Sequence, residues 1–223
     1  MTDSTTPRRR YDSMRRLAQA QQTHADIAVA ARELFVAKGW AATTVRDVAR
    51  AAGVSVPTVY AAYENKKGLV QALADAADLA ADPARQLAEL EATADPRRHL
   101  AAMAAYDRRL FERSGDLLTL IREAGRGEPE LAAVYERGRV LGDRTRVQVL
   151  STWPAHTLRP GLDVATAVDI YAALCNIDVY VTLTVERGWS PQRVEDWWTE
   201  ALARELLSDP VGSASPSERT ADV

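Results

Sequence analysis

The chain of 223 residues has almost no cysteine and no long apolar run. Cys175 stands alone, which excludes an intrachain disulfide and a cysteine-based zinc site. No run of about 18 apolar residues occurs, so we expect no membrane span. The basic N-terminal residues, Arg8 to Arg10 with Arg15 and Arg16, precede no apolar stretch and therefore do not form a secretory signal. The expected location is the cytoplasm.

Strand signals and catalytic motifs are also missing. Asn-Gly and Asp-Gly turns are absent and two-residue alternation is rare, which disfavours hairpins. The chain has no Gly-x-Ser-x-Gly elbow, no phosphate-cradling glycine loop and no His-Glu-x-x-His. Its three histidines, His24, His99 and His156, lie on separate segments without metal-ligand or triad spacing. We expect an all-α fold that is not an enzyme and has no catalytic residues, metal or cofactor.

The charge is distributed unevenly along the chain. The formal net charge is −3, yet residues 1–70 carry eleven Lys and Arg against six Asp and Glu, and the rest of the chain is acidic. A basic N-terminal third favours a polyanionic partner for that part alone. A chance distribution remains an equal alternative, because proteins that bind no anion show differences of this size.

Helical patterns and punctuating prolines and glycines predict the domain organisation. We expect a flexible basic arm over residues 1–19, a small helical domain, the head, over 20–66, a helical body over 67–207 and a disordered tail over 208–223. The predicted helices are residues 20–37, 45–51, 56–61, one that Asn65 opens, and then 96–112, 116–124, 129–151, 163–186 and 191–207. Pro83 marks a connection, and residues 153–163 form a loop.

Residues 43–63 have the arrangement of a helix-turn-helix. Two short predicted helices flank Gly53; Thr44 caps the first, with Asp47 three residues on, and Ser55 caps the second. The second helix presents short or planar groups that fit a major groove, namely Ser55, Pro57, Thr58 and Tyr60. An αα-hairpin that binds no DNA is the alternative.

The next helix begins with two cations, Lys66 and Lys67, just after Tyr63. The helix dipole disfavours cations at an N-terminus, whereas a bound phosphate would favour them. The alternatives are a solvated lysine pair and a core tyrosine ring.

At these positions the sequence closely resembles the N-terminal DNA-binding domain of TetR-family transcriptional regulators. The resemblance covers about residues 23–75 with every gap in register, and the rest of the chain is similar only in being helical. The matching positions are Ile27 to Phe35, Lys38 to Trp40, Thr43 to Val45, Val48, Ala49, Ala52 to Ser55, Thr58 to Tyr60, Tyr63 and Lys66 to Leu69. The family implies a homodimeric repressor that releases a palindromic double-stranded DNA operator when a small-molecule effector binds.

The resemblance also implies residue roles in DNA binding. Phosphate contacts fall on Thr44, Tyr60, Tyr63 and Lys66, and base-edge contacts on Arg46, Val56, Pro57 and Thr58; Ser55 and Lys67 complete the expected surface. The sequence departs from the family at Ala61 and Ala62, which removes possible contacts. A solvent-facing side chain is the alternative for Arg46. The basic arm is expected in a minor groove or on phosphates, with a solvated tail as the alternative.

In the body the resemblance implies an effector cavity and a dimer interface. The expected cavity residues are Met103, Tyr106, Phe111, Tyr135, Tyr171 and Cys175, which suit a hydrophobic or aromatic effector. The last two helices are expected to pair two copies, with one of Trp197 and Trp198 facing the core and the other a partner. The alternative functions are a DNA-binding activator, a chromosome-organising protein without effector control, and a module for protein contacts.

Overall fold

The computed structural model describes residues 6–208, and this part of the chain is helical without a β-strand. One isolated bridge joins Leu158 to Leu207. The elements are α1 (Thr6–Lys38), α2 (Val45–Ala51), α3 (Val56–Tyr63), α4 (Lys66–Ala80), α5 (Pro83–Glu91), α6 (Pro96–Ala124), α7 (Pro129–Ser151), α8 (Val164–Leu174), α9 (Ile177–Val181), the π-helical η1 (Thr182–Glu186) and α10 (Pro191–Leu206). The predicted all-α fold is confirmed.

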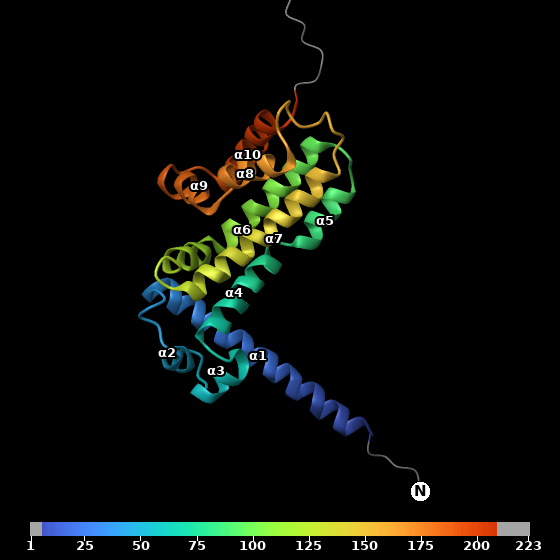
Figure 1. The fold of residues 1–223 in the computed structure, drawn as a ribbon. Coiled ribbons are helices and arrows are strands. Elements are labelled where there is room, and N and C mark those ends of the chain that lie inside the picture. Colours follow the sequence, from blue (N-terminus) through green and yellow to red (C-terminus); the bar gives the residue numbers. More distant parts are fainter. Residues whose placement is uncertain (1–5, 209–223) are drawn as a thin grey trace, which may run out of the picture.

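The head consists of α1, α2, α3 and the start of α4 (Figure 1). Ile27 and Phe35 of α1 are fully buried and share one core with Val48, Val59 and Leu69. Burying each of these side chains stabilises the head by about 1.5–3 kcal/mol. This core fixes the angle between α2 and α3.

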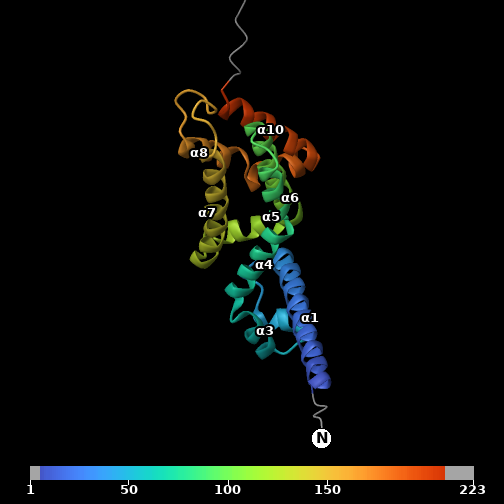
Figure 2. The same ribbon diagram turned by 90° about the vertical axis from the view of Figure 1, so that its right-hand side faces the viewer.

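The body packs around the long helices α6 and α7, which run side by side (Figures 1 and 2). Its core contains Leu100, Met103, Tyr171 and Trp198 from α6, α8 and α10. The helix-turn-helix lies at one end of the molecule and α10 at the other, in both views. The helix-turn-helix and the last helix are therefore spatially separate.

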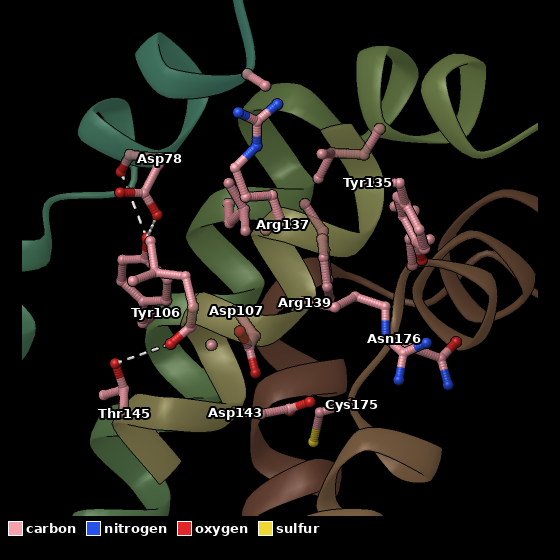
Figure 3. Close-up of a pocket in the computed structure, with 18 of the residues that line it drawn as sticks. Asp78, Tyr106, Asp107, Tyr135, Arg137, Arg139, Asp143, Thr145, Cys175 and Asn176 are labelled. Atoms are coloured by element: carbon pink, nitrogen blue, oxygen red, sulfur yellow. Dashed lines mark hydrogen bonds between the residues drawn. The ribbon is translucent and has the colours of Figure 1, made fainter. Parts of the chain in front are cut away.

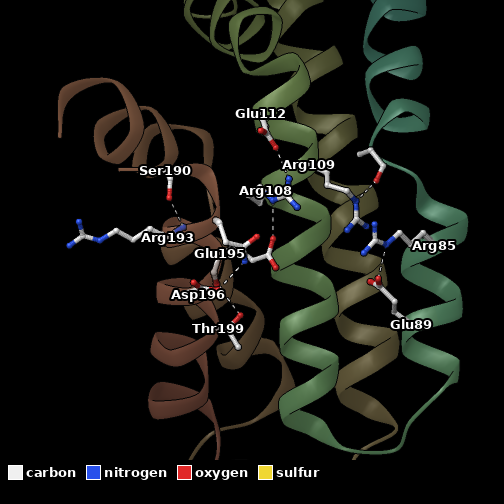
Figure 4. A network of polar contacts seen from close by, with 12 residues as sticks. Arg85, Glu89, Arg108, Arg109, Glu112, Ser190, Arg193, Glu195, Asp196 and Thr199 are labelled. Atoms are coloured by element: carbon white, nitrogen blue, oxygen red, sulfur yellow. Dashed lines mark hydrogen bonds and ion pairs between the residues drawn. The ribbon is translucent and has the colours of Figure 1, made fainter. Parts of the chain in front are cut away.

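An ion pair joins α10 to α6, and a hydrogen bond joins the α4–α5 corner to α6 (Figure 4). Arg108 of α6 donates to Glu112 one turn along and to Glu195 of α10, with Nε–Oε2 at 2.9 Å in the second pair. Arg109 Nε donates to the Ala81 carbonyl at 2.9 Å, which fixes the corner between α4 and α5. These contacts orient the elements that surround α6.

The N-terminal helix is longer than the sequence predicted. We expected it to begin near residue 20 after a flexible arm, but α1 begins at Thr6. Pro7 occupies its first turn, where proline is tolerated, and no proline or glycine interrupts residues 8–38. The arm is therefore helical from Thr6 onward. The predicted tail lies outside the described residues apart from Ser208.

Three other element predictions were wrong in their boundaries. Pro83 was expected only to mark a connection, but it begins a helix, α5, because Asp82 caps that helix. The helices predicted over 96–112 and 116–124 form one element, α6, with a local break at Ser114 (φ −140°, ψ 15°). The helix predicted over 163–186 is divided, because Asn176 caps a new helix after Cys175.

The segment Val164–Glu186 is long and apolar enough to cross a membrane by length and composition, which we had not expected. A core helix passes the same test. Here its backbone changes direction at Cys175, and its parts pack on α6, α7 and α10.

Candidate functional sites: the helix-turn-helix and a cavity in the body

A reciprocal capping box fixes the start of α2. Thr44 Oγ1 accepts from the Asp47 amide at 3.1 Å, and Asp47 Oδ2 accepts from the Thr44 amide at 3.1 Å. The hydrogen bonds from the Thr44 hydroxyl and amide lower the pKa of Asp47 below its ordinary value. The predicted cap is confirmed, and it leaves Thr44 exposed at the N-terminus of the helix.

The second helix of the helix-turn-helix, α3, presents a small, mostly polar surface. Ser55 caps it by accepting from the Thr58 amide at 3.2 Å, and the two hydroxyls lie 2.7 Å apart. Ser55, Pro57 and Tyr60 are exposed, whereas Val56 and Thr58 are half-buried. Gly53, with φ +66°, makes the turn that a side chain would strain.

Arg46 projects from α2 next to this surface. It is exposed, and its side chain forms no hydrogen bond or ion pair with residues 15–208, whose side chains the structure describes. Its five donors are therefore available to a partner, and arginine is the side chain that most often reads guanine.

Two of the predicted phosphate-binding side chains have partners inside the protein. The Tyr63 hydroxyl donates to the His24 carbonyl at 2.8 Å, and Lys66 Nζ donates to the Trp40 carbonyl. Lys66 Nζ also lies 3.8 Å from the centre of the Trp40 ring. Burial lowers the pKa of Lys66 and raises that of Tyr63. These contacts stabilise Lys66 at the start of α4 without a phosphate, which the helix dipole alone did not predict.

Lys67 differs from its neighbour. Its Nζ lies 3.8 Å from Glu130 at the start of α7, and both side chains remain substantially exposed. Exposed pairs of this kind contribute at most about 1 kcal/mol, so Lys67 can leave Glu130 for a phosphate at little cost.

The body contains a cavity of about 630 Å³ between α4, α6, α7 and the break between α8 and α9 (Figure 3). All six predicted side chains line it, and they come from three helices and the α8–α9 junction. They are Met103, Tyr106, Phe111, Tyr135, Tyr171 and Cys175. The volume falls in the range of pockets that hold small organic molecules.

A buried polar cluster that the sequence analysis missed forms one wall of the cavity. Asp107 Oδ2 accepts from the Tyr171 hydroxyl at 2.8 Å and from Arg146 Nη2 at 3.1 Å. Arg146 Nη1 donates to Asp143 at 2.8 Å, and its guanidinium carbon lies 4.4 Å from the Tyr171 ring centre. Burial raises the pKa of Asp107, and Arg146 and Tyr171 oppose this by favouring the carboxylate. Burial also raises the pKa of Cys175, which keeps it a thiol.

Tyr106 joins the cavity to α4. Its hydroxyl donates to Asp78, and burial together with this carboxylate raises the pKa of Tyr106. A signal for Asp107 was present in the sequence, because it follows Leu100, Met103 and Ala104 at helical spacing on an otherwise apolar face. No comparable signal marked Asp78, since its partner is 28 residues away.

The comparisons with known protein sequences find relatives of the N-terminal head. The model of the family "Bacterial regulatory proteins, tetR family" matches residues 27–73. The HTH-type transcriptional regulator TtgR of Pseudomonas putida is 40% identical over 78 residues, which are 35% of this chain and 37% of TtgR. YvkB of Bacillus subtilis, another HTH-type transcriptional regulator, is 45% identical over 51 residues, which are 23% of this chain and 27% of YvkB. The alignments thus span roughly a third of these relatives or less.

The whole fold also has solved counterparts. NalD, the secondary repressor of the MexAB-OprM multidrug efflux pump in Pseudomonas aeruginosa, superposes with a TM-score of 0.68 at 22% identity. The superposition covers 86% of this chain and 98% of NalD, which shows that the head and the body together have the fold of NalD. The N-terminal domain therefore matches that of the tetR family of bacterial regulatory proteins over residues 27–73, and the chain as a whole has the fold of NalD.

Proposed function

We propose that this protein is a sequence-specific DNA-binding transcriptional regulator of the cytoplasm, a repressor that a small-molecule effector releases from a palindromic operator. The observation that carries the DNA-binding part is the exposed surface of α3 with the unpaired guanidinium of Arg46 beside it. The basic charge of residues 1–70 supports it, because phosphates attract that part and repel the acidic body.

In this proposal the residues of the DNA-binding surface have three roles. Arg46, Val56, Pro57 and Thr58 face base edges, while Thr44, Ser55, Tyr60 and Lys67 approach phosphates. Tyr63 and Lys66 act by fixing the start of α4 against α1 and the α1–α2 loop, since both donate to backbone carbonyls there. Each contacts a phosphate only after exchanging that internal partner.

Fluorescence anisotropy with duplexes from the flanks of the protein's own gene tests this function. We expect a specific complex that weakens steeply with salt. Arg46→Ala should lower specific affinity by about 1–3 kcal/mol and leave non-specific affinity nearly unchanged. Arg187→Ala, an exposed arginine of the body, is the matched control for charge. Absence of a specific complex at low salt would contradict the proposal.

The effector and the partner copy complete the proposal. The cavity is the effector site, and its lining residues supply an apolar, aromatic environment. Two copies pair through the last two predicted helices, which in the structure are the segment from α8 to η1 and α10, far from the head. Trp198 is fully buried and faces its own core, while Trp197 remains half-buried beside Trp189. A monomer in sedimentation at micromolar concentration would reject the pairing, and a specific complex that no small molecule relieves would indicate an activator or organising protein.

A further inference from the structure

The cavity carries more negative than positive charge close to its apolar walls. Asp75 and Asp78 lie one turn apart on α4 and both line the cavity. Asp78 accepts the Tyr106 hydroxyl and Asp75 accepts from Gln71, but no Lys or Arg nitrogen of the side chains described, residues 15–208, lies within 4 Å of either carboxylate. A carboxylate beside an apolar cavity without a basic partner favours a cationic ligand.

The arginines of the cavity do not cancel this charge. Arg146 is shared by two carboxylates, Asp107 and Asp143, which leaves one excess negative charge in that cluster. Arg137 and Arg139 are exposed, and Arg139 pairs with Glu136 outside the cavity lining. Figure 3 shows the carboxylates of Asp78, Asp107 and Asp143 reaching the cavity from α4, α6 and α7.

Aromatic rings in the same walls add a second preference for positive charge. Tyr106, Phe111, Tyr135 and Tyr171 contribute rings from α6, α7 and α8. A ring face attracts a cation, and the Arg146 guanidinium already occupies such a position over Tyr171. An anion would instead meet four carboxylates and arginines that already have partners.

We infer that the cavity binds an organic cation, a molecule with an apolar or aromatic body and one positive centre that lies beside Asp78 and against the face of the Tyr106 ring. This rests on the effector cavity of the proposed function and names the chemical class of its ligand. Gly138 of α7 also lines the cavity, and the open space beside it leaves room for the body of such a molecule.

Binding of two near-isosteric ions of opposite charge, tetraphenylphosphonium and tetraphenylborate, tests the inference on the full chain by isothermal calorimetry. Benzyltrimethylammonium and its neutral carbon isostere, neopentylbenzene, form a smaller second pair. We expect the cation to bind at least about tenfold more tightly in one pair or both, a difference of about 1.4 kcal/mol. Equal or tighter binding of the anion and neutral probe, or no binding of any probe, would overturn the inference.

Two variants test whether the Asp78 carboxylate attracts the bound cation. Asp78→Asn keeps an oxygen that accepts the Tyr106 hydroxyl and removes the negative charge, so cation affinity should fall about fivefold or more with neopentylbenzene affinity unchanged. Asp196→Asn removes an exposed carboxylate of α10 outside the cavity and should change neither. If Asp78→Asn melts without cooperativity, Asp75→Asn on the exposed side of the same turn replaces it. Unchanged cation affinity in the folded variant would refute the placement.

The same samples separate this inference from the proposed function. DNA binding is measured without any probe, so a protein that binds duplex but no cation refutes only the ligand class. A protein that binds cations but no duplex refutes only the DNA-binding function.

Discussion

The buried cluster around Asp107 allows a stability prediction with a matched control. Asp107→Ala removes the acceptor of the fully buried Tyr171 hydroxyl and one of the two carboxylates of Arg146. Removing one member of a buried ion pair costs about 3–5 kcal/mol. Because Arg146 keeps Asp143 at 2.8 Å, we expect the low end, about 3–4 kcal/mol. For a protein of this size that lowers the melting temperature by roughly 6–16 °C.

The control lies on the outer side of the same helix (Figure 4). Glu112 pairs with Arg108, which keeps Glu195 as a second carboxylate, so the connectivity matches that of Asp107. The Glu112 side chain is 44% exposed and that of Asp107 only 7%. Glu112→Ala should therefore cost less than about 1 kcal/mol.

Urea unfolding followed by circular dichroism measures both variants at pH 7 and at one protein concentration, because the proposed dimerisation would make apparent stability depend on concentration. Asp107→Asn should fall between them, at roughly 1–2 kcal/mol, since the amide keeps an acceptor for Tyr171 while losing the charge. The reasoning is refuted if Asp107→Ala unfolds cooperatively within 1 kcal/mol of the wild type, or if Glu112→Ala is equally damaging.

Three further predictions concern single positions. The pKa of Asp47 is lowered in the folded protein, so its capping contribution to stability is present above the ordinary pKa and is lost as pH falls through the lowered pKa. The difference in melting temperature between wild type and Asp47→Asn should therefore shrink below about pH 4. A constant difference from pH 7 to pH 3 would contradict this. Gly138→Ala should stabilise by up to about 1 kcal/mol in urea unfolding, because its added Cβ meets no atom within 4 Å and alanine favours helix. Gly68→Ala should destabilise instead, because its Cβ would overlap the Tyr63 carbonyl oxygen, and equal shifts of the two variants would contradict the geometry.

The helix-turn-helix was predictable because its signals are local. Capping residues act within three or four positions, and Gly53 marks the turn between them, so Thr44 and Ser55 could be assigned from spacing alone. The six cavity residues could be named from the family resemblance, and the structure brings them together, although their role in binding stays a prediction.

The break inside α6 at Ser114 was harder to predict, since the contact found there is tertiary. At Ser114 the exposed Arg113 carbonyl accepts from Arg32 of α1 at 2.7 Å, and Arg32 also pairs with Asp116. This contact spans more than 80 residues of sequence. The head therefore contacts α6 at its break, and nothing in the local sequence of α6 indicates that partner.

Lys66 shows the limit of an argument from one helix. The dipole makes a cation at the start of α4 unfavourable by a few tenths of a kcal/mol, and from that cost we inferred an anion. The structure supplies a different compensation, because the α1–α2 loop brings the Trp40 carbonyl and ring to the ammonium group. A cation–π contact of a partly desolvated lysine stabilises by about 1 kcal/mol or more, which exceeds the dipole cost. The lysine at this position is thus explained by folding alone, and the case for a phosphate there depends on Lys67, which remains half-exposed with a weak partner.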